Sequence, residues 1–263
     1  MPAQETTTTK TDGAVARGRA IAWRRGQHAA LCDVIEPWEY GTAVRCTPLP
    51  TFWNYNSVRI EGPDPGASAD ALVHAADILQ GDLAHRQVEF EDDAAGERLQ
   101  PDFAALGWAT ERLAWMLLKG PAPAGPEFEE VPFVETTSLR VEWTRTAPWA
   151  SDDDAAGRFT QHEDTVAALR GTRALLARDA TGAPVGFAAF GTRGDGAEVE
   201  QVYVSPDHRG RGTGGRLVSA AARTAGGATT FIIADDDGDS KRLYERLGFE
   251  TVWIQHVFTR RPG

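Results

Sequence analysis

Segments rich in β-branched and aromatic residues alternate, along the C-terminal half of the chain, with segments whose apolar residues recur at helical spacing. Residues 198–204 (EVEQVYV) have the composition of a strand, and the Ala-rich residues 214–225 (GGRLVSAAARTA) follow with a helical pattern. The pattern then predicts a strand at 229–235, a helix at 240–249 and a final strand at 251–260. Strands that alternate with helices predict an α/β fold, in which helices flank a sheet.

The N-terminal half of the chain shows the same order of elements. Strands and helices are predicted in turn at 56–62, 69–84, 85–93, 96–108 and 109–119. When the helix ends LGW and LGF are aligned, Gly107 falls opposite Gly248 and Phe103 falls opposite Tyr244. This shared order predicts an internal structural duplication.

A Pro-rich segment, GPAPAGP at residues 120–126, divides the chain into parts of similar size and is typical of a linker. Residues 1–13 are polar and Thr-rich, and we expect them to be disordered. The predicted organisation is therefore a disordered tail at 1–13, a first domain at 14–119, the linker, and a second domain at 127–263.

The composition is that of a globular protein, with 41% hydrophobic and 25% charged residues among 263. The apolar runs are shorter than the roughly 20 residues of a membrane span, and the first residues contain no apolar signal core, so we expect a cytoplasmic protein without membrane partners. Cys32 and Cys46 show no ligand spacing, so neither a disulfide framework nor a metal site is predicted. The net charge of −11 argues against nucleic-acid binding and suits cationic substrates.

A glycine-rich loop, SPDHRGRGTGG at residues 205–215, follows the predicted strand at 198–204. Glycines let backbone N–H groups converge on an anion, so the loop predicts phosphate binding. Two patterns overlap within it. The dinucleotide pattern G-x-G-x-x-G is satisfied by Gly210, Gly212 and Gly215, and the pattern R-x-x-G-x-G by Arg209, Gly212 and Gly214.

The surroundings of the loop count against a dinucleotide. Asp235 stands at the spacing of a ribose-binding acid, but Pro206–Arg209 separate the strand from the first glycine. One helix and one strand remain after Asp235, which is too little chain for a dinucleotide-binding fold. An acidic protein that binds phosphates must concentrate positive charge locally. The candidates for such a patch are Arg209, Arg211, Arg216, Lys241 and Arg242.

Two segments of the second half resemble the GNAT superfamily of N-acetyltransferases: VEQVYVSPDHRGRGTGGRLV at 199–218 and KRLYERLGFETV at 241–252. The first contains the family's strand and R-x-x-G-x-G loop, and the second contains its tyrosine helix and LGF turn. The resemblance covers residues 137–263, while the first half looks like a degenerate copy, as in tandem GNAT proteins. It implies two GNAT-like domains, each a mixed, mostly antiparallel sheet flanked by helices, and an acyltransferase that uses acetyl-CoA as co-substrate.

The resemblance also implies which residues bind acetyl-CoA. In the family, backbone amides of this loop hold the CoA diphosphate where the next helix begins, because unpaired N–H groups and the helix dipole favour an anion there. The pantetheine arm lies along the preceding strand. The implied cofactor-binding residues are Val202, Tyr203, Val204, Arg209, Gly210, Arg211, Gly212, Thr213, Gly214 and Gly215.

Direct attack of an amine on the thioester needs a base more than an acid. A lysine-like amine has a pKa of about 10.4 and must lose a proton, whereas the leaving thiol has a pKa of about 8.5. The resemblance makes Glu200 the candidate catalytic base, and strand alternation puts it on one face with Glu198, Val202 and Val204. A water chain in place of this base stays open. Tyr244 aligns with the family's tyrosine near the CoA sulfur, where its hydroxyl hydrogen-bonds the departing thiolate.

The acceptor is the least determined part of the prediction. Trp143, Trp149 and Asp152–Asp154 lie where family members wall the acceptor site, although a core tryptophan and an acidic helix start also explain them. The family's asparagine seven residues before the tyrosine is Asp237 here, which leaves the CoA contacts there open. The predicted function is acetylation of a primary amine on a small molecule or peptide, with a non-catalytic acetyl-CoA sensor or interaction module as the alternative. The oligomeric state stays open, a homodimer included.

Overall fold

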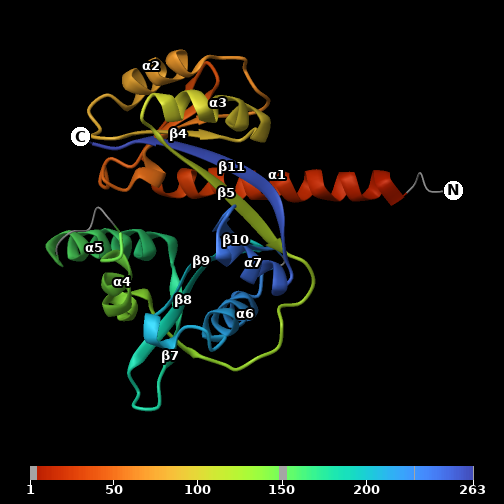
Figure 1. Ribbon diagram of the computed structural model, residues 1–263, viewed down its shortest axis with the longest axis vertical. Helices are drawn as coiled ribbons and strands as arrows, with labels where there is room; N and C mark the ends of the chain where they lie inside the picture. Colours follow the sequence, from red (N-terminus) through yellow and green to blue (C-terminus); the bar gives the residue numbers. More distant parts are fainter. Residues whose placement is uncertain (1–4, 148–152, 228, 263) are drawn as a thin grey trace. The chain divides into compact units, whose positions relative to one another are not determined.

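The computed structural model describes residues 5–147, 153–227 and 229–262, and the chain forms two compact units (Figure 1). Unit 1 consists of Met1–Trp115, Ala234–Lys241 and Thr251–Gly263, and unit 2 consists of Met116–Ile233 and Arg242–Glu250. Within the described ranges, no helix combines the length and the apolar character that crossing a membrane requires.

Unit 1 is built on a mixed sheet with the strand order β1-β2-β3-β4-β11-β5. Its strands are β1 (Val34–Trp38), β2 (Gly41–Arg45), β3 (Ser57–Ile60), β4 (Arg86–Phe90), β5 (Ala109–Leu118) and β11 (Phe249–Arg260). The pairs β1–β2, β2–β3 and β4–β11 run antiparallel, and β3 pairs with β4 in parallel. The last residues of the chain therefore complete the sheet of the first half.

Three helices accompany this sheet: α1 (Glu5–Leu31), α2 (Ala69–Gln80) and α3 (Asp93–Ala105). Local sequence explains where the second and third begin. The hydroxyl of Ser68 accepts a hydrogen bond from the amide of Ala71, and the carboxylate of Asp92 accepts one from the amide of Ala95. Each side chain thus satisfies an amide that the first helical turn leaves unpaired.

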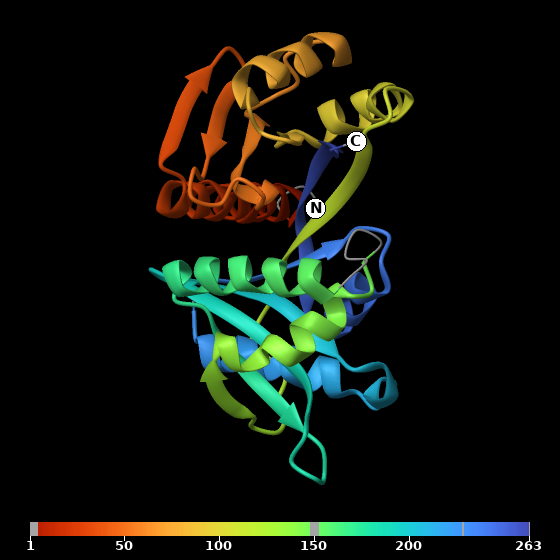
Figure 2. The same cartoon turned by 90° about the vertical axis from the view of Figure 1, so that its left-hand side faces the viewer.

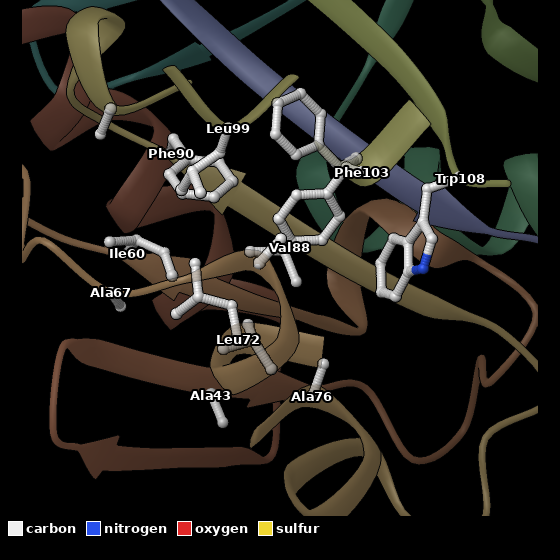
Figure 3. Packing of buried hydrophobic residues seen from close by; sticks show 14 residues of the cluster. Ala43, Ile60, Ala67, Leu72, Ala76, Val88, Phe90, Leu99, Phe103 and Trp108 are labelled. Atoms are coloured by element: carbon white, nitrogen blue, oxygen red, sulfur yellow. The ribbon is translucent and has the colours of Figure 1, made fainter. Parts of the chain in front are cut away.

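An apolar core lies between the sheet of unit 1 and the helices α2 and α3 (Figure 3). Phe103 of α3 is fully buried, and its ring centroid lies 4.8 Å from that of Phe258 and 5.0 Å from that of Trp108. Phe103, the predicted counterpart of Tyr244, is therefore a core residue. A three-residue 3₁₀-helix, Trp53–Tyr55, precedes β3.

Unit 2 contains a second run of strands in the order β10-β9-β8-β7-β6. They are β6 (Glu129–Pro132), β7 (Arg173–Arg178), β8 (Pro184–Arg193), β9 (Gly196–Val204) and β10 (Thr229–Asp235). β9 and β10 pair in parallel, and the other neighbours are antiparallel. The last two residues of β10 belong to unit 1.

The helices of unit 2 are α4 (Thr137–Thr144), α5 (Asp153–Arg170), α6 (Thr213–Ala225) and α7 (Asp239–Arg246), the last of which begins in unit 1. Short 3₁₀-helices, Phe133–Thr136 and Pro206–His208, precede α4 and α6. Figure 2 shows α4 and α5 side by side over the strands of this unit. The glycine loop connects β9 to α6, as the sequence predicts.

The predicted fold class is confirmed: mixed, mostly antiparallel strands are flanked by helices. Two details differ from prediction. α1 begins at Glu5, so residues 5–13 are helical rather than a disordered tail. The compact units also do not end at residues 120–126, because β11 pairs with β4, His256 opposite Phe90, and joins unit 1. The division into two GNAT-like domains stays a prediction.

Candidate active site

Strand β9 carries a β-bulge at the position of the predicted base. Phe190 of β8 pairs with Val199, and Ala189 pairs with Gln201, so Glu200 has no partner across the ladder. A bulge turns the side chain of its extra residue and breaks the alternation of faces beyond it. β9 therefore changes its pattern of faces at Glu200.

The contacts of β9 show the consequence of the bulge. Glu200 and Gln201 both contact the α5 side, through Arg170 and Glu163, whereas Val204 approaches α6 at Gly214. The prediction that strand alternation places Glu200 on one face with Val202 and Val204 is wrong, because regular alternation does not continue through a bulge.

Glu200 is surrounded by charged and small residues. Its Oε1 is 2.8 Å from Nη2 of Arg170, and its Oε2 accepts a hydrogen bond from Oγ1 of Thr172 at 3.1 Å. The same Arg170 nitrogen lies 3.2 Å from Oε2 of Glu198, so two carboxylates share one guanidinium. Gly191 makes room for this arrangement, because a Cβ at this position would lie 2.4 Å from Oε1 of Glu200.

The surroundings bring the Glu200 carboxyl into the range of a neutral-pH base. Burial raises the pKa of Glu200 from an ordinary 4.5 to about 7, Arg170 opposes this rise, and the charge of Glu198 adds to it. Only 11% of its side-chain surface is exposed. A carboxyl with a pKa near neutral can take and release a proton under ordinary conditions, as general base catalysis requires.

A second row of buried polar contacts lies behind Glu200 and was not predicted from the sequence. Nε2 of Gln201 donates to Oε1 of Glu163 at 2.7 Å, and Oε2 of Glu163 lies 3.1 Å from the fully buried Arg140. The Arg140 guanidinium also stacks on the ring of Phe133, with Cζ 4.2 Å from the centroid. These contacts tie α4 and α5 to the bulge.

The glycine loop presents unpaired backbone amides. Gly210 and Gly212 have φ of +73° and +75°, a region that favours glycine. Gly212 is the residue before α6 and has no side chain to cap the helix. Its carbonyl oxygen accepts a hydrogen bond from the amide of Arg216 at 3.1 Å. The amides of the intervening Thr213, Gly214 and Gly215 belong to the first helical turn, where N–H groups point outward. This loop fits a diphosphate group.

Arg209 has a structural role in the described structure. Its Nε donates to the carbonyl of Val204 at 2.8 Å, and its guanidinium lies 5.5 Å from the ring centroid of Tyr203. Val202 to Val204 pair with β8 on one side, while the parallel pairing with β10 ends at Val199 and Ile232. The resemblance predicts that the pantetheine arm lies along this part of the strand.

Tyr244 lies on α7 with 7% of its surface exposed, and its ring centroid is 6.3 Å from that of Phe249. Burial raises its pKa to about 12. Such a phenol holds its proton against a thiolate and acts as a hydrogen-bond donor. Asp237 is exposed, and its amide donates to the carboxylate of Asp235 at 3.3 Å.

Some of the residues predicted for the acceptor site are described by the structure, and others lie outside the described residues. Trp143 stacks on Tyr203 at 5.8 Å between centroids and remains 38% exposed. Its neighbour Glu142 accepts a hydrogen bond from the hydroxyl of Ser205 at 2.8 Å. Trp149 and Asp152 lie outside the described residues, as do the side chains of Asp153 and Asp154. Of these candidate acceptor residues, Trp143 is the one whose side chain is described. It lies on α4 and contacts Tyr203 near the end of β9, the strand that carries Glu200.

Comparison with known proteins shows what part of this arrangement resembles. Residues 170–251 match the family described as "Acetyltransferase (GNAT) domain". A mycothiol acetyltransferase from Segniliparus rotundus is 43% identical over 84 residues, which cover 31% of this chain and 31% of that protein. The matched stretch thus spans about a third of the curated relative.

Two solved structures share the fold over most of the chain. A functionally unknown conserved protein from Staphylococcus epidermidis superposes with a TM-score of 0.69 at 15% identity, covering 88% of this chain and 95% of that one. A putative GNAT acetyltransferase from Novosphingobium aromaticivorans has a TM-score of 0.53 at 19% identity, covering 89% and 92%. The match over residues 170–251 is to a GNAT acetyltransferase domain, which confirms the predicted resemblance for this region.

Proposed function

We propose that this protein is an acetyl-CoA-dependent N-acetyltransferase that acetylates a primary amine of a small molecule or peptide by direct attack. The observation that carries the proposal is the largely buried Glu200, whose pKa is raised to about 7, on the strand that leads into the loop of unpaired amides. This reaction needs a base and an anion cradle, and here the candidate base lies in the middle of β9 and the candidate cradle follows its end.

Glu200 accepts the proton that the acceptor amine must lose. A lysine-like amine at pH 7 is about 3.4 pKa units from neutrality, about 4.6 kcal/mol, whereas an α-amine of pKa near 8 is about one unit away. Arg170 and Thr172 hold the carboxylate in place while it acts. When acetyl-CoA is bound it supplies the thioester, and the acetyl group passes directly to the amine nitrogen.

Tyr244 assists the departure of the thiolate by donating a hydrogen bond, and its raised pKa keeps the donor proton in place. The amides of Thr213, Gly214 and Gly215 hold the CoA diphosphate. The free edge of Val202–Val204 carries the pantetheine arm as an added strand. These roles follow the residues that the resemblance implies, and the unpaired amides and the end of the β10 pairing support them.

The test is release of CoA thiol from acetyl-CoA across a panel of primary amines, with the acceptor of mycothiol acetyltransferase as one member. Turnover is expected with at least one amine, and Glu200→Gln should reduce kcat by about 10²–10⁴, the range of general base catalysis. Glu245→Gln, an exposed carboxylate of α7, is the control and should leave kcat unchanged. Binding of acetyl-CoA without thiol release for any amine would instead favour the sensor.

A further inference from the structure

Strand β9 returns to its ladder immediately after the bulge, at Gln201. Gln201 pairs with Ala189 of β8, whereas Glu200 has no partner there, so the strand changes from unpaired to paired within one residue. A bulge disrupts the ladder locally, because its extra residue is left out of the pairing. Contacts outside the ladder are therefore needed to keep Glu200 at the bulge, and Gln201 is the neighbouring residue that makes one.

The side chain of Gln201 is attached to α5. Its Nε2 donates to Oε1 of Glu163 at 2.7 Å, and Glu163 is buried, with 7% of its surface exposed. A hydrogen bond to a carboxylate is stronger than one between neutral groups. Two consecutive residues of β9 thus contact the same helix, Glu200 through Arg170 and Gln201 through Glu163. Consecutive residues of a regular strand point to opposite faces, so these two contacts together require the bulge.

Arg140 fixes Glu163 in turn. Arg140 is fully buried, and its Nη1 lies 3.1 Å from Oε2 of Glu163 and donates to the carbonyl of Thr160 at 3.0 Å. Its Nε donates to the hydroxyl of Thr136 at 3.0 Å, and its guanidinium stacks on the ring of Phe133. Because the planar guanidinium is restrained by all of these contacts, Glu163 is a fixed anchor for Gln201. These residues all belong to unit 2.

Stability alone does not explain this anchor. A buried ion pair loses its hydration, and apolar residues of similar volume often stabilise a core equally well. Oε1 of Gln201 is also buried and, among the residues that the structure describes, has no hydrogen-bond partner. An unpaired buried acceptor costs free energy. Two unfavourable features directly beside the candidate base favour a role in the reaction over a role in packing.

We propose that Gln201 is a positioning residue for the proposed reaction: its hydrogen bond to Glu163 holds β9 in the bulge and so keeps the carboxyl of Glu200 beside Arg170. The inference rests on the proposed function, because the group that is positioned is the proposed base. Gln201 acts through Glu200 and not on the substrate. Without the hydrogen bond, β9 is free to relax at the bulge, and the Glu200 carboxyl leaves its buried surroundings.

The test replaces Gln201 by methionine, which has a similar length but no donor for Glu163. Gln201→Met should lower kcat by about 10- to 100-fold, because small displacement of a catalytic group is costly, and should leave the Kd of acetyl-CoA unchanged. In a Glu200→Gln background the same replacement should change kcat by less than about twofold, since the group that Gln201 positions is already absent. Equal reductions of kcat in both backgrounds would overturn the proposal and assign Gln201 to structure alone.

A titration of Glu200 makes the test independent of turnover. Arg170 of α5 and Glu198 of β9 are the charged groups that face this carboxyl, and burial raises its pKa to about 7. When the bulge relaxes in Gln201→Met, the carboxyl loses this burial, so its pKa should fall toward the ordinary 4.5. Carbon-13 NMR of labelled glutamate follows the titration, and Glu200→Gln identifies the signal.

The titration also separates this inference from the proposed function. An unchanged pKa of Glu200 in Gln201→Met would overturn the positioning role, whatever the rates show. A lowered pKa in Gln201→Met, in a protein that acetylates no amine, would overturn the proposed function and leave the positioning of Glu200 intact.

Two further variants control the experiment. Gln161→Met makes the same replacement at an exposed position of α5, the helix that carries Glu163, and should change neither kcat nor the pKa of Glu200. Gln201→Asn keeps the amide but is one methylene shorter, so its amide does not reach Glu163, and it should show the same losses as Gln201→Met. Full activity of Gln201→Asn, with folding verified by far-UV circular dichroism, would contradict the proposal.

Discussion

Nη2 of Arg170, the last residue of α5, lies 2.8 Å from Oε1 of Glu200 at the bulge of β9. This ion pair favours the ionised carboxylate and so opposes the burial that raises its pKa. Glu198 shares the same guanidinium and acts in the opposite direction. The reactivity of Glu200 thus depends on the balance between two neighbours of opposite charge.

The pH dependence of the reaction should report this balance. With Glu200 as the base, kcat/KM is expected to rise with pH through an apparent pKa near 7, because the carboxylate form is the active one. Arg170→Gln removes the opposing cation and should move this limb to higher pH. Glu198→Gln should move it to lower pH. Initial rates of thiol release between pH 5 and 9 measure the limb, and shifts of both variants in the same direction would contradict the assignment.

Gly191→Ala should reduce activity with little effect on folding. The added methyl would lie 2.4 Å from Oε1 of Glu200, so the flexible carboxylate moves rather than the backbone. We expect kcat to fall by about tenfold or more, since small misplacement of a catalytic group is costly, while the free energy of unfolding changes by less than about 1 kcal/mol. Rates and urea titrations check this.

The matched control for Gly191→Ala is Gly157→Ala in α5, where an added methyl has no neighbour within 4 Å. It should keep full activity, and its unfolding free energy should stay equal or rise, because alanine favours a helix over glycine. A large loss of stability in Gly191→Ala, with activity preserved per folded molecule, would show that the glycine serves packing instead of catalysis.

Tyr244→Phe should lower kcat while leaving the Kd of acetyl-CoA nearly unchanged. The phenol has a pKa of about 12, so the lost function is a hydrogen bond to the departing sulfur rather than a proton transfer. Removing one such donor is expected to cost about 10²- to 10³-fold in kcat. Unchanged turnover would remove Tyr244 from the mechanism. Phe103, at the position predicted to be equivalent in the first half, is a fully buried phenylalanine.

Acid should destabilise unit 1 through Glu89 and His28. Glu89 is buried, 2.6 Å from Nη2 of Arg24, and its pKa is lowered to about 2 by Arg24 and His28 despite burial, which acts to raise it. The stability from this pair is complete above pH 4.5 and is lost as pH falls toward 2. Burial also lowers the pKa of His28 to about 3, so the unfolded chain gains a proton below pH 6.5 that the folded chain rejects, and stability falls over that window as well.

Glu89→Gln tests this account by removing the carboxylate charge that lies 2.6 Å from the buried Arg24. The expected loss at pH 7 is about 3–5 kcal/mol of unfolding free energy, measured by urea unfolding followed with far-UV circular dichroism. Between pH 4.5 and 3 the variant should lose less further stability than the unaltered protein. Glu36→Gln on the exposed side of β1 is the control and should change stability by less than about 0.5 kcal/mol. An identical pH dependence of the Glu89 and Glu36 variants would contradict the assignment.

Local sequence predicted the strands and helices from residue 198 onward because their signals are short-range. The predicted strand at 198–204 is the end of β9, and the predicted helix at 214–225 is α6 within one residue. The positive φ of Gly210 and Gly212 follows from the same short segment, since glycine tolerates this conformation wherever it occurs. The loop therefore follows from residues close together in the chain, whereas Glu200 and Tyr244 follow from the resemblance to a family.

The partners that set the chemistry of Glu200 could not come from such a reading. Arg170, Thr172 and Gly191 lie 30, 28 and 9 residues before it and meet it through β7, β8 and the end of α5. The bulge exists only in the pairing of β9 with β8. The prediction that Val202 and Val204 share a face with Glu200 was wrong for this reason.

The sequence by itself determined the elements from residue 198 onward and the glycine loop, because each depends on the conformational preferences of residues close together in the chain. The resemblance to a family supplied Glu200 and Tyr244 as the candidate base and tyrosine. Tertiary structure alone decided which face Glu200 uses, how its pKa reaches neutrality and which helix anchors Gln201. It also decided that β11 completes the sheet of unit 1. These properties arise from burial, charge and strand pairing between residues far apart in the chain, and such contacts exist only once the chain has folded.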